Sequence, residues 1–72
     1  MKRKFKLQDL DCANCAAKME TAIAKINGVT AVSVNFMTQS LTLEADDNLF
    51  SGIIDEAVKI CKKIEPDCVI LR

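Results

Sequence analysis

The chain has 72 residues, half of them apolar, and its only aromatic residues are three Phe. Ten acidic and ten basic residues cancel, which argues against nucleic acid as a partner because neutralising phosphates requires a basic surplus. There is neither a signal peptide nor an apolar run of about 18 residues, so we expect one cytoplasmic domain, residues 1–72, with reduced thiols.

The first third of the chain predicts a strand, a polar loop and a helix. Polar and apolar residues alternate over 4–8, as in a half-buried strand, and the polar segment 9–14 interrupts this alternation. From Cys15 to Asn27 the apolar residues recur at helical spacing in an alanine-rich segment. Gly28 is the expected C-terminal stop of this helix.

The middle of the chain predicts a β-hairpin followed by a second helix. Alternation returns over 32–36 and 41–45, and the polar link 37–40 between them is typical of a hairpin turn. Asn48 or Ser51 is expected to cap the helix that follows. The apolar face of that helix comprises Ile54, Ala57, Val58, Cys61 and Ile64.

Pro66 is expected to end the second helix, and residues 69–71 form a last short strand. The resulting β-α-β-β-α-β order predicts an α+β, ferredoxin-like sandwich. In this fold two helices cover one face of a four-stranded antiparallel sheet, and the alternating strands agree with a sheet that has one solvated face.

Two cysteines lie at the junction of the first strand and the first helix. Cys12 falls in the loop and Cys15 in the first helical turn, close to free backbone N–H groups and the positive end of the helix dipole. We expect this environment to stabilise thiolates, which are better nucleophiles and better metal ligands than thiols.

Three kinds of chemistry fit this CxxC motif. A closed structural zinc site needs four ligands, but Cys61 lies on an apolar helix face and the chain has no His. A dithiol redox pair has the right strand-to-helix context, whereas the Ala-Asn spacer and the lack of a preceding aromatic residue argue against it. The interpretation we favour is an open two-thiolate site that binds a cation and passes it on by ligand exchange.

The whole chain resembles the heavy-metal-associated domain, the small βαββαβ module of metallochaperones and heavy-metal P-type ATPases. The resemblance is carried by the CxxC at the first loop, by Asn27-Gly28-Val29 and by the strand at 32–36. Together with the segment at 62–67 before the last strand, it looks most like the N-terminal domain of zinc/cadmium/lead-exporting P-type ATPases.

The residues before the first cysteine depart from the copper-type pattern of Gly, Met, a variable residue and Cys. Leu10 stands where that Met packs into the domain, which is a volume-conserving exchange. Asp11 occupies the variable place, and the zinc-type branch of the family implies that it is a metal ligand. Zn²⁺ and Cd²⁺ accept carboxylate oxygen beside sulfur, whereas Cu(I) gains little from it. The alternative is that Asp11 or Asp9 caps the first helix.

For the other cysteine, methionine and charged side chains we expect mainly structural positions. Cys61 and Met19 are expected in the core, Cys68 in the last strand without a ligand role, and Met37 exposed in the hairpin turn. Lys63, with its neighbour at 62, is a candidate second-sphere residue that offsets the charge of the occupied site, or else a solvated helix end. The acidic run 44–47 is expected to be a solvated turn.

We therefore expect a non-catalytic module that binds Zn²⁺, Cd²⁺ or Pb²⁺ through Asp11, Cys12 and Cys15, with Cu⁺ as the alternative. The expected partner is the membrane portion of its own ATPase, in the cell membrane, or another metal-binding domain. A free-standing metallochaperone is the second hypothesis and a dithiol redox protein the third. The module is expected to be a monomer, with a metal-bridged dimer left open.

Overall fold

The computed structural model describes residues 1–71. Its elements follow the order β-α-β-β-α-β, which confirms the ferredoxin-like prediction. They are β1 (Lys2–Gln8), α1 (Ala13–Ala24), β2 (Val29–Asn35), β3 (Ser40–Ala45), α2 (Phe50–Ile64) and β4 (Val69–Leu71).

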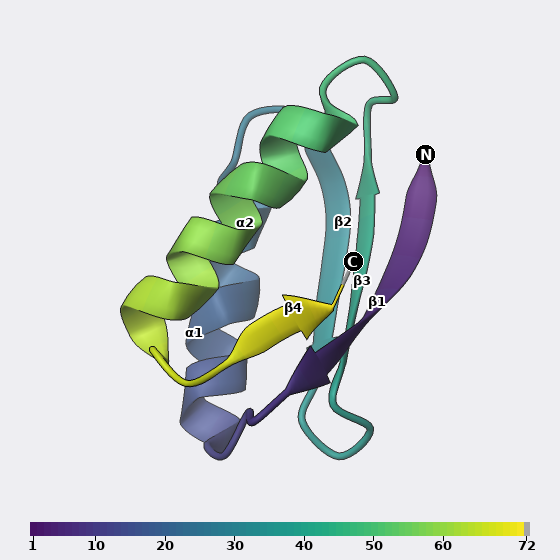
Figure 1. The fold of residues 1–72 in the computed structure, drawn as a ribbon. Coiled ribbons are helices and arrows are strands. Elements are labelled where there is room, and N and C mark those ends of the chain that lie inside the picture. The colour runs from purple at the N-terminus through teal and green to yellow at the C-terminus, as the bar shows by residue number, and fades with distance from the viewer. Residues whose placement is uncertain (72) are drawn as a thin grey trace.

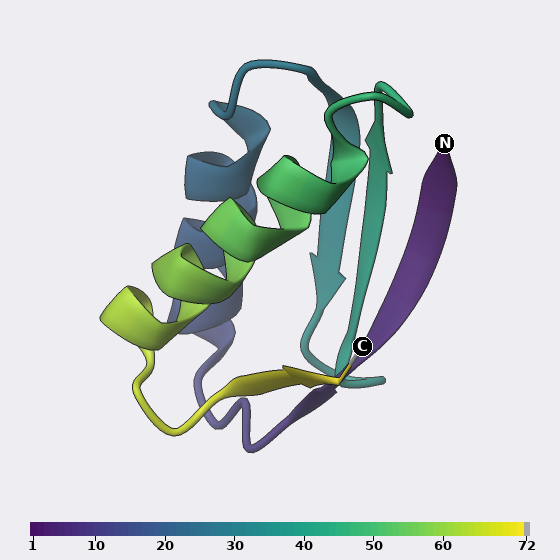
Figure 2. The same ribbon diagram turned by 45° about the horizontal axis from the view of Figure 1, so that its top comes forward.

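The four strands form one antiparallel sheet in the order β2-β3-β1-β4. Lys6 of β1 lies opposite Ser40 on one side and Leu71 on the other, so β1 is an inner strand. Strand β3 is the second inner strand, because it pairs with both β1 and β2. Both helices cover the same face of this sheet (Figures 1 and 2). The opposite face carries the alternate polar residues of the strands, as the period-2 pattern requires.

The core lies between the helices and the sheet and is mainly aliphatic. Phe5 of β1 and Phe50 of α2 stack across it, with ring centroids 6.2 Å apart. Met19 and Cys61 are buried in this core, as predicted. The largest side chains that solvent does not reach are Leu10, Met19, Ile23, Leu41, Leu43, Cys61 and Cys68.

Helix α1 ends at Ala24, three residues before the predicted end at Asn27. Ile26 follows the helical spacing, but it packs against the core from a turn that leads into β2. Gly28 belongs to that turn and has a φ of +101°. A Cβ on Gly28 would lie 2.9 Å from Cδ1 of the half-exposed Leu49, which can move aside, so it is the positive φ that requires glycine there.

Helix α2 begins at Phe50 and has no side-chain cap, so the prediction of Asn48 or Ser51 as the N-cap is wrong. Leu49 holds the cap position. The Asn48 N–H donates instead to Asp46 Oδ1 at 2.9 Å and closes the turn before the helix. A very amphipathic helix that is anchored by its apolar face does not depend on a cap to form.

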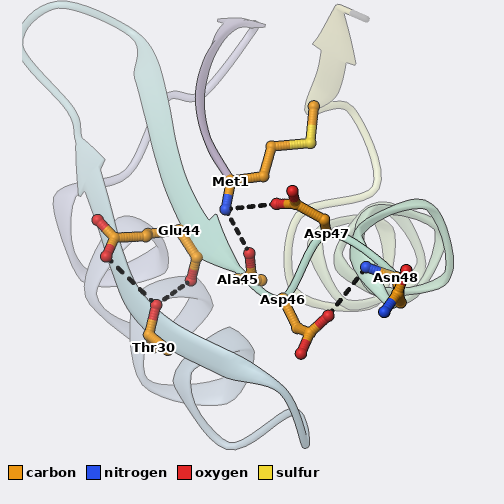
Figure 3. Close-up of polar contacts among 7 residues, drawn as sticks. All are labelled: Met1, Thr30, Glu44, Ala45, Asp46, Asp47 and Asn48. Carbon is orange, nitrogen blue, oxygen red and sulfur yellow. Dashed lines mark hydrogen bonds and ion pairs between the residues drawn. The ribbon is translucent and has the colours of Figure 1, made fainter.

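Polar contacts around the β3–α2 turn hold the chain's first residue in place (Figure 3). The Met1 amine donates to the Ala45 carbonyl at 2.8 Å and pairs with Asp47 at 2.7 Å. The acidic run is thus only partly a turn, because Glu44 lies in β3 and accepts a hydrogen bond from Thr30. These contacts lie at the opposite end of the sheet from the Cys12–Cys15 loop (Figure 1).

Candidate metal centre

Three connections meet at one end of the molecule (Figures 1 and 2). They are the loop between β1 and α1, the turn between β2 and β3, and the link between α2 and β4. The first, residues 9–12, is called the metal loop below. Because the chain crosses the molecule between these connections, side chains distant in sequence come together around the metal loop.

Cys12 lies in the loop, where it is the N-cap of α1, and Cys15 lies in the first helical turn, as predicted. The Cys12 sulfur accepts a hydrogen bond from the Cys15 N–H at 3.3 Å. Cys12 is therefore the N-cap, and the prediction that Asp11 or Asp9 caps the helix is wrong. Both thiols are free and half-buried, so they remain within reach of a metal ion.

The two sulfurs differ in acidity. The hydrogen bond from the Cys15 side chain, followed by that from the Cys15 N–H, lowers the pKa of Cys12. The same side-chain hydrogen bond, together with desolvation, raises the pKa of Cys15 to about 11. The expectation of two stabilised thiolates is thus right for Cys12 and wrong for Cys15, because one proton shared by two sulfurs makes the second ionisation harder.

Glu65 also lies at this site, although the sequence patterns did not reveal it. Its Oε2 accepts a hydrogen bond from Cys15 Sγ at 3.8 Å, across 50 residues of sequence. It follows α2 directly, in extended conformation, and its N–H donates to the Cys61 carbonyl at 2.8 Å. The βαββαβ order itself was the available signal, because it returns the α2–β4 link to the vicinity of the metal loop.

Asp11 is exposed and precedes Cys12 directly. Within residues 1–71, no three His, Cys, Asp or Glu side chains are gathered closely enough to form a ready ligand set. Lys63 is exposed in the last turn of α2, the position of a solvated helix end. Of the residues near the end of α2, it is Glu65 whose side chain contacts Cys15.

The other two cysteines are buried, each 1% exposed. Cys68 precedes β4 by one residue, so the prediction that it lies within the last strand is wrong. Desolvation, and then the proximity of Cys68, raise the pKa of Cys61 to about 12. Desolvation, followed by the charges of Glu65 and two aspartates, also raises the pKa of Cys68. Neutral buried thiols are poor ligands, which argues against a cage of four cysteines.

Fold and site together define a class: small βαββαβ modules that carry a reduced, accessible CxxC where the first strand meets the first helix. The sequence matches the heavy-metal-associated domain over residues 4–66. The chain belongs to this family.

Known relatives include both ATPases and a chaperone. A cadmium, zinc and cobalt-transporting ATPase of Bacillus subtilis (strain 168) is 33% identical over 70 residues, which make up 97% of this chain and 10% of that protein. The copper chaperone CopZ of Enterococcus hirae is 28% identical over 64 residues, covering 89% of this chain and 86% of the chaperone. This chain thus spans about a tenth of the ATPase and most of the chaperone.

Among solved structures, the fold resembles the N-terminal domain of a potential copper-translocating P-type ATPase from Bacillus subtilis in its Cu(I)-loaded state. The TM-score is 0.75 at 26% identity, over 96% of this chain and 84% of that chain. The relatives therefore include transporters of divalent metals and proteins of copper handling. Neither helix of the described residues is long and apolar enough to cross a bilayer.

Proposed function

We propose that this domain binds a soft or borderline divalent cation, Zn²⁺, Cd²⁺ or Pb²⁺, and passes it on by ligand exchange. Cys12, Cys15 and Asp11 are the proposed ligands, and Glu65 is a fourth donor within reach. The observation that carries the proposal is the contact between the Cys15 sulfur and the Glu65 carboxylate at 3.8 Å. It joins a hard oxygen donor to a pair of soft sulfur donors.

This mixed donor set favours divalent ions over Cu(I). Zn²⁺ takes about four ligands and accepts carboxylate oxygen as well as thiolate, whereas two thiolates are enough for Cu(I). Two thiolates and one carboxylate leave a divalent site with one negative charge, and a monovalent site with two. Each carboxylate close to the sulfurs therefore favours the ion of higher charge.

The half-buried sulfurs support transfer rather than storage. A partner's ligands can attack the metal while Cys12 and Cys15 still hold it, so the ion does not pass through free solution. Exposed Asp11 is the donor most easily exchanged for a partner's ligand. The domain itself carries out no catalytic step in this scheme.

For the whole protein we propose the cytoplasmic N-terminal domain of a heavy-metal P-type ATPase, which delivers the ion to the membrane portion. The Bacillus subtilis ATPase, similar over nearly the whole of this chain, supports this choice. The second candidate is a free-standing metallochaperone, favoured by the match that covers 86% of the copper chaperone. In either case residues 1–72 act as one module, with Lys63 as a proposed second-sphere residue and a metal-bridged dimer as an alternative to the monomer.

Competition titrations of Asp11→Asn and Glu65→Gln with Cd²⁺, Zn²⁺ and Cu(I) test the ligand set. We expect both variants to lose about tenfold or more in affinity for the divalent ions and little for Cu(I). Asp9→Asn is the matched control, since it removes the same charge from the same loop and Asn tolerates the positive φ of 62° at this position. An equal loss for all metals, or an equal effect of Asp9→Asn, would remove the carboxylates from the coordination sphere.

A further inference from the structure

Gln39 lies in the turn between β2 and β3, beside the metal loop. Its backbone carbonyl accepts the Leu7 N–H at 2.7 Å, one step beyond the β1–β3 pair of Lys6 and Ser40. Its φ is +52°, a conformation that glycine or asparagine adopts more easily than glutamine. The backbone of the turn therefore gives no reason for a glutamine here, whereas the side chain does.

The side-chain amide of Gln39 makes three hydrogen bonds, which use both of its N–H donors and its oxygen. Its Oε1 accepts the Leu10 N–H at 3.0 Å, and its Nε2 donates to the Leu10 carbonyl at 2.7 Å. The same Nε2 also donates to the Phe36 carbonyl at 2.9 Å. Gln39 thus pairs with both backbone groups of Leu10, much as a neighbouring strand would, and joins the hairpin turn to the metal loop.

Leu10 is the last residue before the proposed ligands Asp11 and Cys12, and both its side chain and its backbone are held. Its side chain is buried in the core, 2% exposed, and it directly precedes Asp11 and Cys12. Gln39 fixes the backbone of Leu10 while the core fixes its side chain. The direction in which the chain leaves for Asp11 and Cys12 is therefore set by these two constraints, and the Cys12 sulfur is next held only at the helix N-terminus.

We propose that Gln39 is a positioning residue for the metal site. By holding both peptide groups at Leu10, it keeps Cys12 at the separation from Cys15 that a bound ion requires. The inference rests on the proposed function. Groups that orient ligands without touching the metal change affinity by about 10- to 100-fold when they are removed.

The alternative is that Gln39 merely stabilises the hairpin turn. Two variants separate these roles. Gln39→Gly removes the amide, including its hydrogen bond to the Phe36 carbonyl within the turn, but it relieves the positive φ, so it weakens the turn less than Gln39→Met does. Gln39→Met keeps the length and volume of the side chain without its hydrogen bonds. Met37→Ala is the matched control, because Met37 lies in the same turn and is 86% exposed.

Three quantities are measured for each variant: Cd²⁺ affinity by competition, hydrogen exchange of the Leu10 amide by NMR, and the thermal midpoint of the metal-free protein. We expect Gln39→Gly and Gln39→Met to lose Leu10 protection and to bind Cd²⁺ about tenfold more weakly. The midpoint of Gln39→Gly should fall less than that of Gln39→Met, because glycine relieves the positive φ, whereas the loss of Cd²⁺ affinity should be equal in the two variants. Met37→Ala should match the wild type in all three quantities.

Two results overturn the proposal. One is loss of Leu10 protection with unchanged Cd²⁺ affinity, which would mean that the hydrogen bonds between Gln39 and Leu10 exist but do not position the ligands. The other is a loss of affinity that follows the loss of stability, so that it is larger in Gln39→Met than in Gln39→Gly. Failure of the proposed function looks different, because the wild type itself would then bind no divalent ion; the same variants titrated with Cu(I) would still decide the role of Gln39.

Discussion

Cys12 combines two tasks that are usually given to different residues. Its sulfur caps α1 through the Cys15 N–H in the metal-free protein and is also a proposed ligand. An N–H donor directed at this sulfur stabilises negative charge on it, whether the sulfur is a thiolate or metal-bound. The helix start and the metal site therefore share one hydrogen bond, and substitutions at Cys12 should affect both.

The double role predicts different effects for two substitutions of Cys12. Cys12→Ser keeps a side-chain acceptor at the N-cap, whereas Cys12→Ala removes it. We expect Cys12→Ala to lower the free energy of unfolding of the metal-free protein by about 1 kcal/mol relative to Cys12→Ser. Urea titrations followed by circular dichroism measure this difference, and both variants should lose metal binding. Equal stability of the two variants would contradict the capping role.

The unequal acidity of the two thiols predicts a pH dependence of binding. A bound ion needs both thiolates, and Cys15, with its pKa raised to about 11, is protonated at neutral pH. Binding therefore displaces a proton, and the affinity should rise by about tenfold per pH unit between the lowered pKa of Cys12 and that of Cys15. Cd²⁺–thiolate absorbance measured in competition at several pH values reports this slope. A flat profile from about pH 7 to 9 would show that Cys15 is already ionised.

The sequence was sufficient to place the two cysteines but not to describe their surroundings. Strand and helix periodicity located Cys12 in the loop and Cys15 in the first turn. Aspartate is a common N-cap residue, which suggested Asp11 as the cap of α1. Residue-type preferences do not include the hydrogen bond from the Cys15 N–H to the Cys12 sulfur, so they missed Cys12 as the cap. Glu65 and Gln39 reach the site through the tertiary fold, and local patterns carry no information on such contacts.

At the level of elements, the two glycines have opposite roles. Gly28 has a positive φ that side chains rarely adopt, whereas Gly52 in α2 has no such constraint and a Cβ added there would meet nothing within 4 Å. Glycine is thus required at the turn before β2, but within α2 it only adds conformational freedom to the unfolded chain.

Alanine substitutions at the two glycines should shift stability in opposite directions. We expect Gly28→Ala to lower the free energy of unfolding by about 1–3 kcal/mol, through backbone strain at the positive φ. Gly52→Ala should raise it by about 0.5–1 kcal/mol. Urea midpoints of the metal-free variants measure both effects. No loss of stability in Gly28→Ala would mean that the turn at Gly28 relaxes freely, and a loss in Gly52→Ala would contradict the role assigned to the glycine in α2.

The alternation of the strands was predicted more accurately than the ends of the elements, since β2 begins at Val29 and not at residue 32. The alternating residues of β1, β2 and β3 point to the two faces of the sheet in turn, so their pattern survives folding. The end of α1 was misplaced because Ile26 follows the helical spacing yet packs from a turn. The start of α2 was misplaced because its amphipathic face, not a capping side chain, decides where it begins.

In the whole molecule, the four cysteines form two pairs with different surroundings. Cys12 and Cys15 are half-buried at one end, whereas Cys61 and Cys68 are buried in the core. The second pair contributes packing and stays neutral, since desolvation raises the pKa of both thiols. This separation predicts that alkaline pH acts on the fold through the buried pair.

Burial raises the pKa of Cys61 from 9.0 to about 12 in the folded protein. An acid whose pKa is raised by folding contributes stability that is complete below the unfolded pKa and is lost as the pH rises through the folded value. The free energy of unfolding should therefore decline between about pH 9 and 12. Cys61→Ala should show a shallower decline from a lower starting value. An unchanged slope in this variant would assign alkaline unfolding to other groups.

The most direct test of the proposed metal site is an NMR titration of the reduced wild-type domain with Cd²⁺, followed by competition with Cu(I). We predict one bound ion per chain, with amide shifts concentrated at residues 10–15 and at Glu65, and Cd²⁺ retained against modest amounts of Cu(I). Shifts centred on Cys61 and Cys68, or no binding of Cd²⁺ at micromolar concentration, would contradict it.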